Sequence, residues 1–203
     1  KEPEVVDLAG VLSAMGARIE GAGESTMVIE GVKSLAGASY EVIPDRIETG
    51  TFLAAAGITK GRFTIAGGRA EHVTAIIEKL MDMGIDIQEG PAGTIAVNGD
   101  CDLQPIHVET VPFPGFPTDM QAQIMSLACV ADGVSSITEN IFENRFMHVP
   151  ELVRMGAGLE EKGRTVIIRG IERFQGASVM ATDLRASASL VLAALNASGY
   201  TEI

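Results

Sequence analysis

Hydrophobic and polar positions along the chain follow one pattern that returns three times. Each copy is a helical stretch with one apolar face, and each ends at a Met-Gly pair, at residues 15–16, 83–84 and 155–156. The apolar face of the first copy consists of Val6, Leu8, Val11, Leu12 and Met15. Glycine after such a stretch is typical of a helix C-terminus, because it adopts positive φ without strain. We therefore predict helices that end at these pairs.

Each Met-Gly pair is followed by residues that predict two strands. Residues 17–20 alternate apolar and polar side chains, which is typical of a strand with one buried face. A turn then leads to a second strand. The second strands of the three copies end at Gly31, Gly99 and Gly170. Their spacing matches that of the Met-Gly pairs, so we interpret the chain as a repeat.

An aspartate provides another marker in the same rhythm. Asp45, Asp119 and Asp183 each open a helix rich in apolar or small residues. A glycine follows each of these helices, and the residues after it predict further strands at 62–65, 134–138 and 200–203. The repeating unit is therefore a helix, a strand, a second helix and a pair of strands, about 70 residues long.

The helices after the three aspartates are apolar on all sides, for example at residues 52–58 and 189–195, so we expect them at the centre with the sheets outside. The predicted fold is a mixed α/β protein of the α+β class, an inside-out prism of repeated units with buried helices and outer sheets. The chain begins and ends halfway through a unit. Residues 1–44 and 183–203 could pair to complete a third block, but we favour a split in which the N-terminal part docks beside the rest.

Composition and charge exclude several classes of protein. Among 203 residues, 27 acidic and 15 basic side chains give a net charge of −12, which disfavours nucleic acid as a partner. No apolar run approaches the ~18 residues that a membrane span needs, and the acidic residues 1–4 are unlike a signal peptide. Cys101 and Cys129 have no metal-ligand spacing. These features predict a soluble cytoplasmic protein without a membrane segment.

The repeated aspartates have two interpretations. One is helix capping, in which Thr118 and Gln121 form a capping box and Asp45 has a similar spacing to Glu48. The other is a carboxylate that points into a cleft and takes a proton from a hydroxyl group. Asp119 is the best candidate for this role, because Thr118 can cap the helix and leave the Asp119 side chain free.

Arginines stand close to these aspartates. Arg46 and Arg185 lie in the first turn of their helices, where the backbone already favours anions, and a guanidinium adds bidentate binding of phosphate or carboxylate. Arg145 is a third candidate. The alternative is a surface ion pair with a neighbouring acid, such as Arg46 with Glu48 or Arg145 with Glu143.

Other reactive side chains suggest no metal or cofactor site. The histidines share no ligand spacing and are expected at the surface or on strands: His72, His107 and His148. Cys129 is expected to be a buried apolar residue. Cys101 stands between two aspartates, whose like charge disfavours its thiolate.

Longer motifs resemble a known family. Residues 116–123, Glu139 and residues 142–152 resemble the UDP-N-acetylglucosamine 1-carboxyvinyltransferases of the enolpyruvyl transferase family, and further matches lie at residues 1–7, 44–53 and 180–190. The resemblance covers the whole chain but about half of the family's length. It implies two lobes, each a prism of three α/β units. On this basis residues 1–44 close the preceding lobe and form a hinge, and residues 45–203 form the second lobe without its last stretch.

The resemblance also implies a reaction and its residues. Phosphoenolpyruvate and UDP-N-acetylglucosamine bind between the lobes, and the enolpyruvyl group passes to the 3′-hydroxyl of the sugar, the first committed step of peptidoglycan synthesis. By motif match, Asp119 contacts and deprotonates that hydroxyl, Ile141 and Phe142 contact the UDP-sugar, and Arg145 and Arg185 hold phosphoenolpyruvate. Four more residues line the cleft: Glu2, Asp45, Arg46 and Asp183.

The family's proton donor, a cysteine on a Gly-rich loop, and its Lys-Asn pair belong to the preceding half and are absent from these 203 residues. Neither Cys101 nor Cys129 lies in that loop motif. We therefore expect the isolated chain to be inactive and its partner to be the missing N-terminal half of the same enzyme. Two alternatives remain. One is a catalytically silent binding or interaction fragment, and the other is a relative of the shikimate-pathway enolpyruvyl transferase, which the motifs at 116–123 and 143–148 disfavour.

Overall fold

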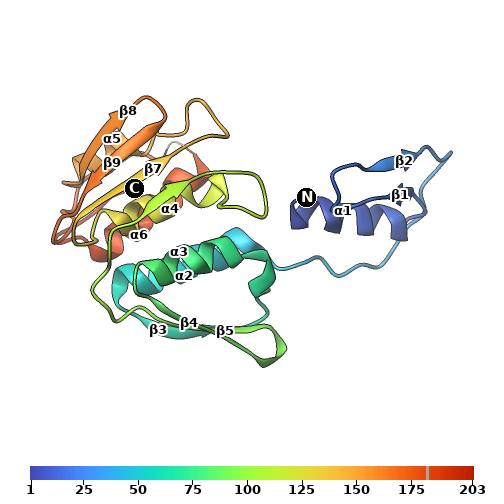
Figure 1. The fold of residues 1–203 in the computed structure, drawn as a ribbon, viewed down its shortest axis with the longest axis horizontal. Coiled ribbons are helices and arrows are strands. Elements are labelled where there is room, and N and C mark those ends of the chain that lie inside the picture. The colour runs from blue at the N-terminus through green and yellow to red at the C-terminus, as the bar shows by residue number, and fades with distance from the viewer. Residues whose placement is uncertain (182) are drawn as a thin grey trace.

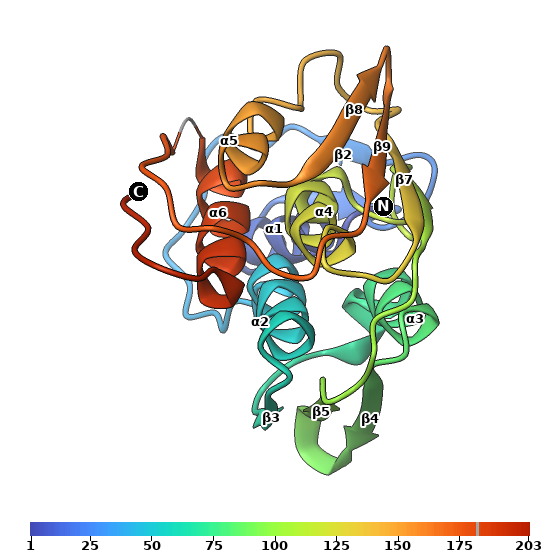
Figure 2. The same ribbon diagram turned by 90° about the vertical axis from the view of Figure 1, so that its left-hand side faces the viewer.

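Three helices form the centre of the molecule. The computed structural model describes residues 1–181 and 183–203. The central helices are α2 (Arg46–Thr59), α4 (Gln121–Ala128) and α6 (Leu184–Asn196), which pack against one another with the sheets outside (Figure 2). Every residue of α4 is buried, as expected for a helix that is apolar or small on all sides. The predicted inside-out arrangement is confirmed.

Two outer sheets flank the central helices. The first has the order β3-β5-β4, with antiparallel strands β3 (Arg62–Ile65), β5 (Thr94–Asn98) and β4 (Asp86–Gly90). The second has the order β6-β7-β9-β8. In it, β6 (His107–Glu109) runs parallel to β7 (Val134–Thr138), whereas β9 (Thr165–Arg169) is antiparallel to both β7 and β8 (Gly158–Lys162).

The Met-Gly pairs end helices as predicted. The three helices are α1 (Pro3–Ala14), α3 (Thr74–Asp82) and α5 (Val149–Arg154), and each has methionine as its C-cap. The glycines that follow have φ of +102°, +96° and +91°, at Gly16, Gly84 and Gly156. Residues with a side chain rarely adopt this backbone conformation, so glycine at this position fixes where the helix ends.

Glycines at the ends of the second strands have a different reason. A Cβ atom on Gly99 would lie 2.0 Å from the carbonyl oxygen of Ala56 in α2, and one on Gly170 would lie 1.9 Å from that of Ala131, just after α4. Each outer sheet therefore approaches the central layer so closely that only glycine fits. Gly31 holds the same place in the repeat, and a Cβ there would meet nothing within 4 Å.

The N-terminal residues form a small body of their own. It consists of α1 and the antiparallel strands β1 (Arg18–Glu20) and β2 (Val28–Glu30), and an extended segment joins it to α2 (Figure 1). Glu4 Oε1 accepts a hydrogen bond from Arg46 Nε at 2.7 Å, which ties this body to the start of α2. Several of its apolar side chains remain exposed, including Leu8, Val28 and Ile29.

The C-terminal residues pair with a segment that lies nearby in the sequence. Parallel bridges join Gln175 with Ser198 and Ser178 with Glu202. The strand predicted at 200–203 is therefore reduced to one bridged residue, because its partner segment at 175–178 is itself irregular. Within the described residues, β1 and β2 pair only with each other, so the two chain ends do not complete a common block.

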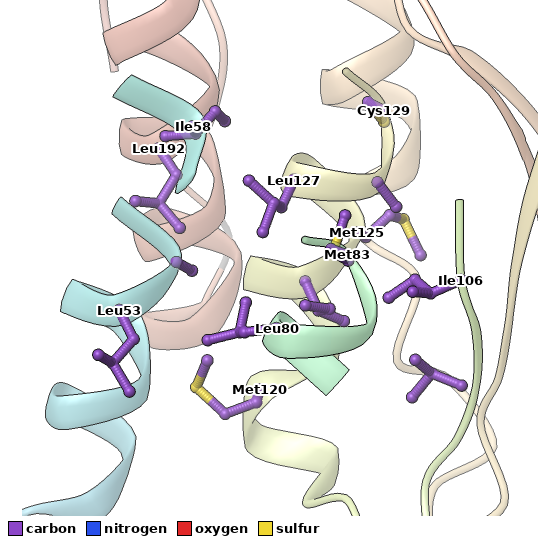
Figure 3. Packing of buried hydrophobic residues seen from close by; sticks show 14 of the residues in the cluster. Leu53, Ile58, Leu80, Met83, Ile106, Met120, Met125, Leu127, Cys129 and Leu192 are labelled. Atoms are coloured by element: carbon purple, nitrogen blue, oxygen red, sulfur yellow. The ribbon is translucent and has the colours of Figure 1, made fainter. Parts of the chain in front are cut away.

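The core joins the central helices to α3, α5 and both outer sheets. Its fully buried members include Leu53, Leu80, Met83, Met120 and Leu127 (Figure 3). Gly57 on α2 lets the neighbouring layer approach, since a Cβ there would lie 2.5 Å from Ile85 Cδ1 and 3.1 Å from Leu127 Cδ1. Among the described residues, no helix combines the length and the apolar character needed to cross a membrane.

Candidate active site

The candidate site lies where the three central helices begin. Asp45 caps α2, accepting from the amides of Ile47 at 2.7 Å and Glu48 at 3.0 Å. Asp183 caps α6 in the same way, accepting from the amides of Arg185 at 2.8 Å and Ala186 at 2.9 Å. For these two aspartates the capping interpretation is confirmed, because each side chain takes up amides of the first helical turn.

Asp119 differs from the other two aspartates. It lies inside a short 3₁₀ turn, η3 (Thr118–Met120), that precedes α4. The expected capping box of Thr118 and Gln121 is wrong: Thr118 Oγ1 donates to Glu139 Oε2 at 2.8 Å, and the Gln121 amide has no partner in the described part of the chain. The 3₁₀ turn moves Thr118 into the helical segment, away from the capping position. Asp119 is nevertheless free of capping, as predicted.

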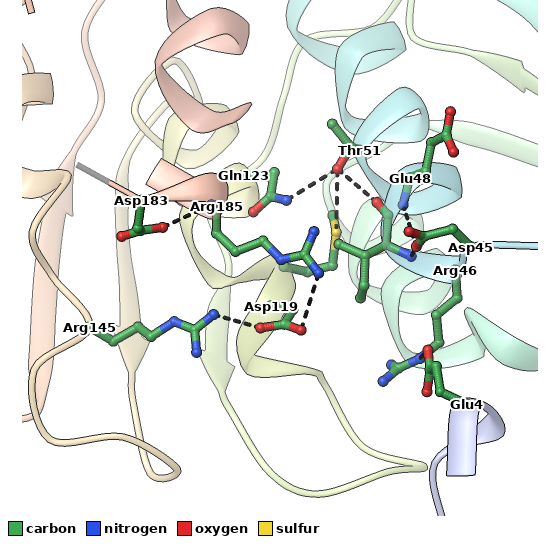
Figure 4. A network of polar contacts seen from close by, with 12 residues as sticks. Glu4, Asp45, Arg46, Glu48, Thr51, Asp119, Gln123, Arg145, Asp183 and Arg185 are labelled. Carbon is green, nitrogen blue, oxygen red and sulfur yellow. Dashed lines mark hydrogen bonds and ion pairs between the residues drawn. The ribbon is translucent and has the colours of Figure 1, made fainter. Parts of the chain in front are cut away.

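Asp119 is held between two arginines. Arg145 Nη2 donates to Oδ1 of Asp119 at 2.5 Å, and Arg185 Nη2 donates to Oδ2 at 3.3 Å (Figure 4). The Asp119 side chain is 37% exposed and the arginines 23% and 26%, so the cluster opens to solvent. The Arg145 guanidinium also lies over the Phe142 ring, 4.8 Å from its centroid. The structure thus brings together four of the predicted site residues.

The alternative ion pairs with neighbouring acids are not formed. Arg145 pairs with Asp119 instead of Glu143, and Arg46 pairs with Glu4 instead of Glu48. Arg46 is 9% exposed, and its guanidinium also lies 5.7 Å from the centroid of the Phe113 ring. The packing of distant segments places these partners closer than the residues next in sequence.

The remaining predicted residues lie around this cluster. Ile141 and Phe142 are exposed, so both side chains are accessible to a ligand. Glu2 is half-buried at the start of α1, where its carbonyl oxygen accepts from the amides of Val5 and Val6. It makes no direct contact with Asp119 or the arginines in the described residues. The cleft-lining roles of Glu2, Asp45, Arg46 and Asp183 stay predictions.

Hollows lie at both ends of the central helices. One of about 310 Å³ lies between Arg46, Phe113 and Pro117, two residues before Asp119. A larger one, about 970 Å³, lies at the opposite end, beside Lys60, Cys101 and the C-termini of the central helices. The larger hollow is remote from the arginine pair. The smaller one is lined by Arg46, a predicted cleft residue, and by none of Asp119, Arg145 and Arg185.

Two buried residues were missed as parts of the site. Glu139 is 1% exposed and follows β7; its only signal in the sequence was its place in the family motif. His148 is 2% exposed at the start of α5, so the expectation of a surface or strand position is wrong for it. Burial lowers the pKa of His148 to about 4; Arg145 adds to this effect and Asp183 opposes it. The other histidines differ, since His107 is exposed on β6 and His72 is partly exposed.

The cysteines are not placed for nucleophilic chemistry. Cys129 is fully buried in the core, which confirms it as a buried apolar residue, and burial raises the pKa of its thiol to about 12. Burial also raises the pKa of Cys101, more than its aspartate neighbours do, and Lys60 opposes the change. Like charge was therefore the smaller cause. No group of three metal-ligating side chains comes together among residues 1–181 and 183–203.

Comparison with known proteins identifies the family. The chain belongs to the EPSP synthase (3-phosphoshikimate 1-carboxyvinyltransferase) family, whose model matches residues 1–203. It is 56% identical to the UDP-N-acetylglucosamine 1-carboxyvinyltransferase of Nitratidesulfovibrio vulgaris and covers 49% of it. It is 54% identical to the protein of that name from Trichlorobacter lovleyi and covers 48% of it. Both matches include 100% of this chain, which therefore spans about half the length of these relatives.

Solved structures show the same fold. The enolpyruvyl transferase NikO from Streptomyces tendae superposes with a TM-score of 0.81 at 30% identity, over 97% of this chain and 47% of that one. EPSP synthase from Acinetobacter baumannii gives a TM-score of 0.69 at 24% identity, over 93% and 47%. The resemblance to enolpyruvyl transferases inferred from the sequence motifs is confirmed.

Proposed function

We propose that this chain supplies half of the active site of an enzyme that transfers the enolpyruvyl group of phosphoenolpyruvate to the 3′-hydroxyl of UDP-N-acetylglucosamine. The observation that carries the proposal is the Asp119 carboxylate held between Arg145 and Arg185 at the starts of the central helices. Relatives at 52–56% identity have the name of that activity. The reaction belongs to peptidoglycan synthesis in the cytoplasm.

The reaction needs a base and an anion clamp. The sugar hydroxyl adds to C2 of the enolpyruvate and gives up its proton, while the methylene carbon C3 gains one. The resulting tetrahedral adduct then loses phosphate from C2 and a proton from C3, which restores the double bond. Arg145 and Arg185 neutralise the carboxylate and phosphate of the substrate, and Asp119 takes the hydroxyl proton.

Binding of substrate also prepares the base. Without a ligand, the Asp119 carboxylate occupies the guanidinium N–H groups that a substrate carboxylate or phosphate would use. A substrate anion that binds the arginines displaces Asp119, whose oxygens are then free to accept a proton. The arginine pair thus links arrival of phosphoenolpyruvate to release of the base.

The other half of the site belongs to the rest of the enzyme. We assign residues 1–44 to the closure of the preceding lobe and the hinge, and residues 45–203 to the second lobe. The exposed apolar side chains of the N-terminal body and its extended connection to α2 support this division. The cysteine that donates the proton and the Lys-Asn pair belong to the missing half, so the isolated chain is inactive.

Phosphate release from phosphoenolpyruvate tests the proposal. The full-length protein should release phosphate with UDP-N-acetylglucosamine and not with shikimate 3-phosphate, and residues 1–203 alone should release none. Turnover with shikimate 3-phosphate would replace the proposal with the shikimate-pathway reaction. A full-length protein that binds phosphoenolpyruvate without turnover would favour a silent binding module.

A further inference from the structure

The Glu139 side chain is buried and accepts four hydrogen bonds. Its Oε1 accepts from Thr110 Oγ1 at 2.8 Å and from the amides of Ile141 at 2.8 Å and Phe142 at 3.1 Å. Its Oε2 accepts from Thr118 Oγ1 at 2.8 Å. All four partners act as donors, so the side chain is satisfied as a carboxylate. A buried charge is kept at such a place only when its partners are in position.

The four donors come from three separate segments. Thr110 follows β6 and its amide donates to Thr138 O of β7 at 3.0 Å, so it is anchored to the sheet. Thr118 immediately precedes Asp119 in the 3₁₀ turn. Ile141 and Phe142 begin the loop that leads to Arg145. Glu139 therefore links the turn that carries Asp119 and the loop that carries Arg145 to the β6–β7 side of one sheet.

The contacts form a closed ring of interactions. Glu139 accepts from Thr118 on one side and from the amides of Ile141 and Phe142 on the other. The Phe142 ring lies under the Arg145 guanidinium, and Arg145 donates to Asp119, which is next to Thr118. When substrate displaces Asp119 from Arg145, the ring of interactions opens at that link. The Glu139 links are then what keeps the base and the clamp at a fixed separation.

We propose that Glu139 is a positioning residue of the enzyme. It sets where Asp119 and Arg145 stand relative to each other during the reaction, and it does so through Thr118 on one side and the 141–142 amides on the other. Both of its oxygens are occupied, so it does not touch substrate. This assignment rests on the proposed function, because the two residues it positions are the base and one of the two clamp arginines of that reaction.

Variants of the full-length protein separate the link from Glu139 to the Asp119 turn from its link to the Arg145 loop. Thr118→Val removes only the link to the Asp119 turn, and it should lower kcat about 10-fold or more while KM for phosphoenolpyruvate changes less than about threefold. Thr110→Val removes a donor to Glu139 Oε1, the oxygen that also accepts from the Ile141 and Phe142 amides. It should therefore loosen the loop that leads to Arg145 and mainly raise the KM for phosphoenolpyruvate. Thr118→Ser keeps the hydroxyl and should restore kcat. The matched control is Thr94→Val, which removes a threonine hydroxyl that donates to Pro91 O at 2.8 Å in the other outer sheet.

Substitution of Glu139 itself provides the second comparison. In Glu139→Gln the amide oxygen can still accept from Ile141 and Phe142, and the amide nitrogen can donate to Thr118 Oγ1, so kcat should fall less than about threefold. Glu139→Ala should lose about 100-fold or more in kcat/KM. The proposal is overturned if Thr118→Val behaves like Thr94→Val. It is also overturned if Thr118→Ser, folded with wild-type melting temperature, fails to recover kcat.

Hydrogen exchange keeps this proposal separate from the proposed function. The peptide that covers residues 140–146 should exchange at least about 10-fold faster in Glu139→Ala than in wild type, and at the wild-type rate in Thr94→Val. If wild-type protein releases no phosphate but this pattern holds, the proposed function fails and the positioning role stands. Unchanged exchange in a folded Glu139→Ala protein would contradict the role whatever the activity.

Discussion

Arg145 donates to Asp119 from a position 26 residues further along the chain, across 2.5 Å. Arg145 is the nearest basic residue to Asp119 in the sequence, but Glu143 lies only two residues from Arg145. The pair joins the turn before α4 to the loop after β7. In the ligand-free molecule, the candidate base therefore serves as the counter-ion of the candidate anion clamp.

Replacement of Asp119 should separate chemistry from stability. Asp119→Asn in the full-length protein removes the group that takes the hydroxyl proton, and we expect turnover to fall about 10²–10⁴-fold. The carboxylate is partly exposed, so its ion pairs contribute little to stability, and the melting temperature should change by only a few degrees. Phosphate-release kinetics and thermal unfolding check this. A collapsed melting temperature with normal activity in the surviving protein would make Asp119 structural.

The same substitution should strengthen anion binding by the isolated chain. Asp119 competes for Arg145 and Arg185, so Asp119→Asn should lower the Kd for phosphoenolpyruvate about 3- to 10-fold, measured by calorimetry at low salt. Asp132→Asn is the matched control, because it removes one negative charge beside the remote hollow. If the Kd for phosphoenolpyruvate falls equally in both variants, the change in net charge is the cause, and Asp119 does not compete with the anion for the arginines.

His148 should make stability fall in mild acid. Its folded pKa of about 4 lies below the ordinary value of 6.5, so between these values the unfolded chain binds a proton that the folded chain does not. The free energy of unfolding should therefore decrease as pH falls through this window, by about 2 kcal/mol from pH 7 to pH 5 for this residue. Urea unfolding of wild type and His148→Leu measures the difference.

The His148→Leu variant should lose less free energy of unfolding between pH 7 and pH 5 than the wild type does. His107→Gln, at an exposed position on β6, serves as the control for removal of a histidine and should keep the wild-type loss. An equal decrease in His148→Leu would assign the acid sensitivity to other groups.

Gly99 and Gly31 should respond differently to the same change. Gly99→Ala places a Cβ against the Ala56 carbonyl oxygen, and because backbone must move we expect a loss of about 2 kcal/mol or more. Gly31→Ala meets nothing within 4 Å and has no positive φ, so it should be nearly neutral in this chain. Thermal unfolding of the two variants compares them directly, and equal melting temperatures would contradict the close approach of sheet to helix.

Local rules account for what the sequence predicted well. The helix ends at the Met-Gly pairs depend on one residue that tolerates positive φ, and the caps Asp45 and Asp183 depend on amides two and three residues away. Such requirements are satisfied within one turn of chain. The inside-out arrangement also followed from local composition, because helices without a polar face have nowhere to lie except the centre.

Partners brought together by packing could not be read in the same way. Arg145 and Arg185 reach Asp119 from 26 and 66 residues away, and local spacing favoured Glu143 for the first of them. The expected capping box placed the helix start at Thr118, but a 3₁₀ turn occupies residues 118–120 and α4 begins at Gln121. Thr118 therefore does not occupy a capping position. His148 is the N-cap of α5, a six-residue helix that is too short for a periodicity that would reveal the burial of His148.

The common direction of α2, α4 and α6 has a kinetic consequence. Their positive ends, with Arg145 and Arg185, lie at one end of a molecule whose net charge is −12. At physiological ionic strength the attraction by these groups and the repulsion by distant acids both fall off over about 8 Å, the Debye length. An anion at the helix starts is therefore affected mainly by the groups near it. Added salt weakens that attraction, so bound anions should leave sooner as ionic strength rises.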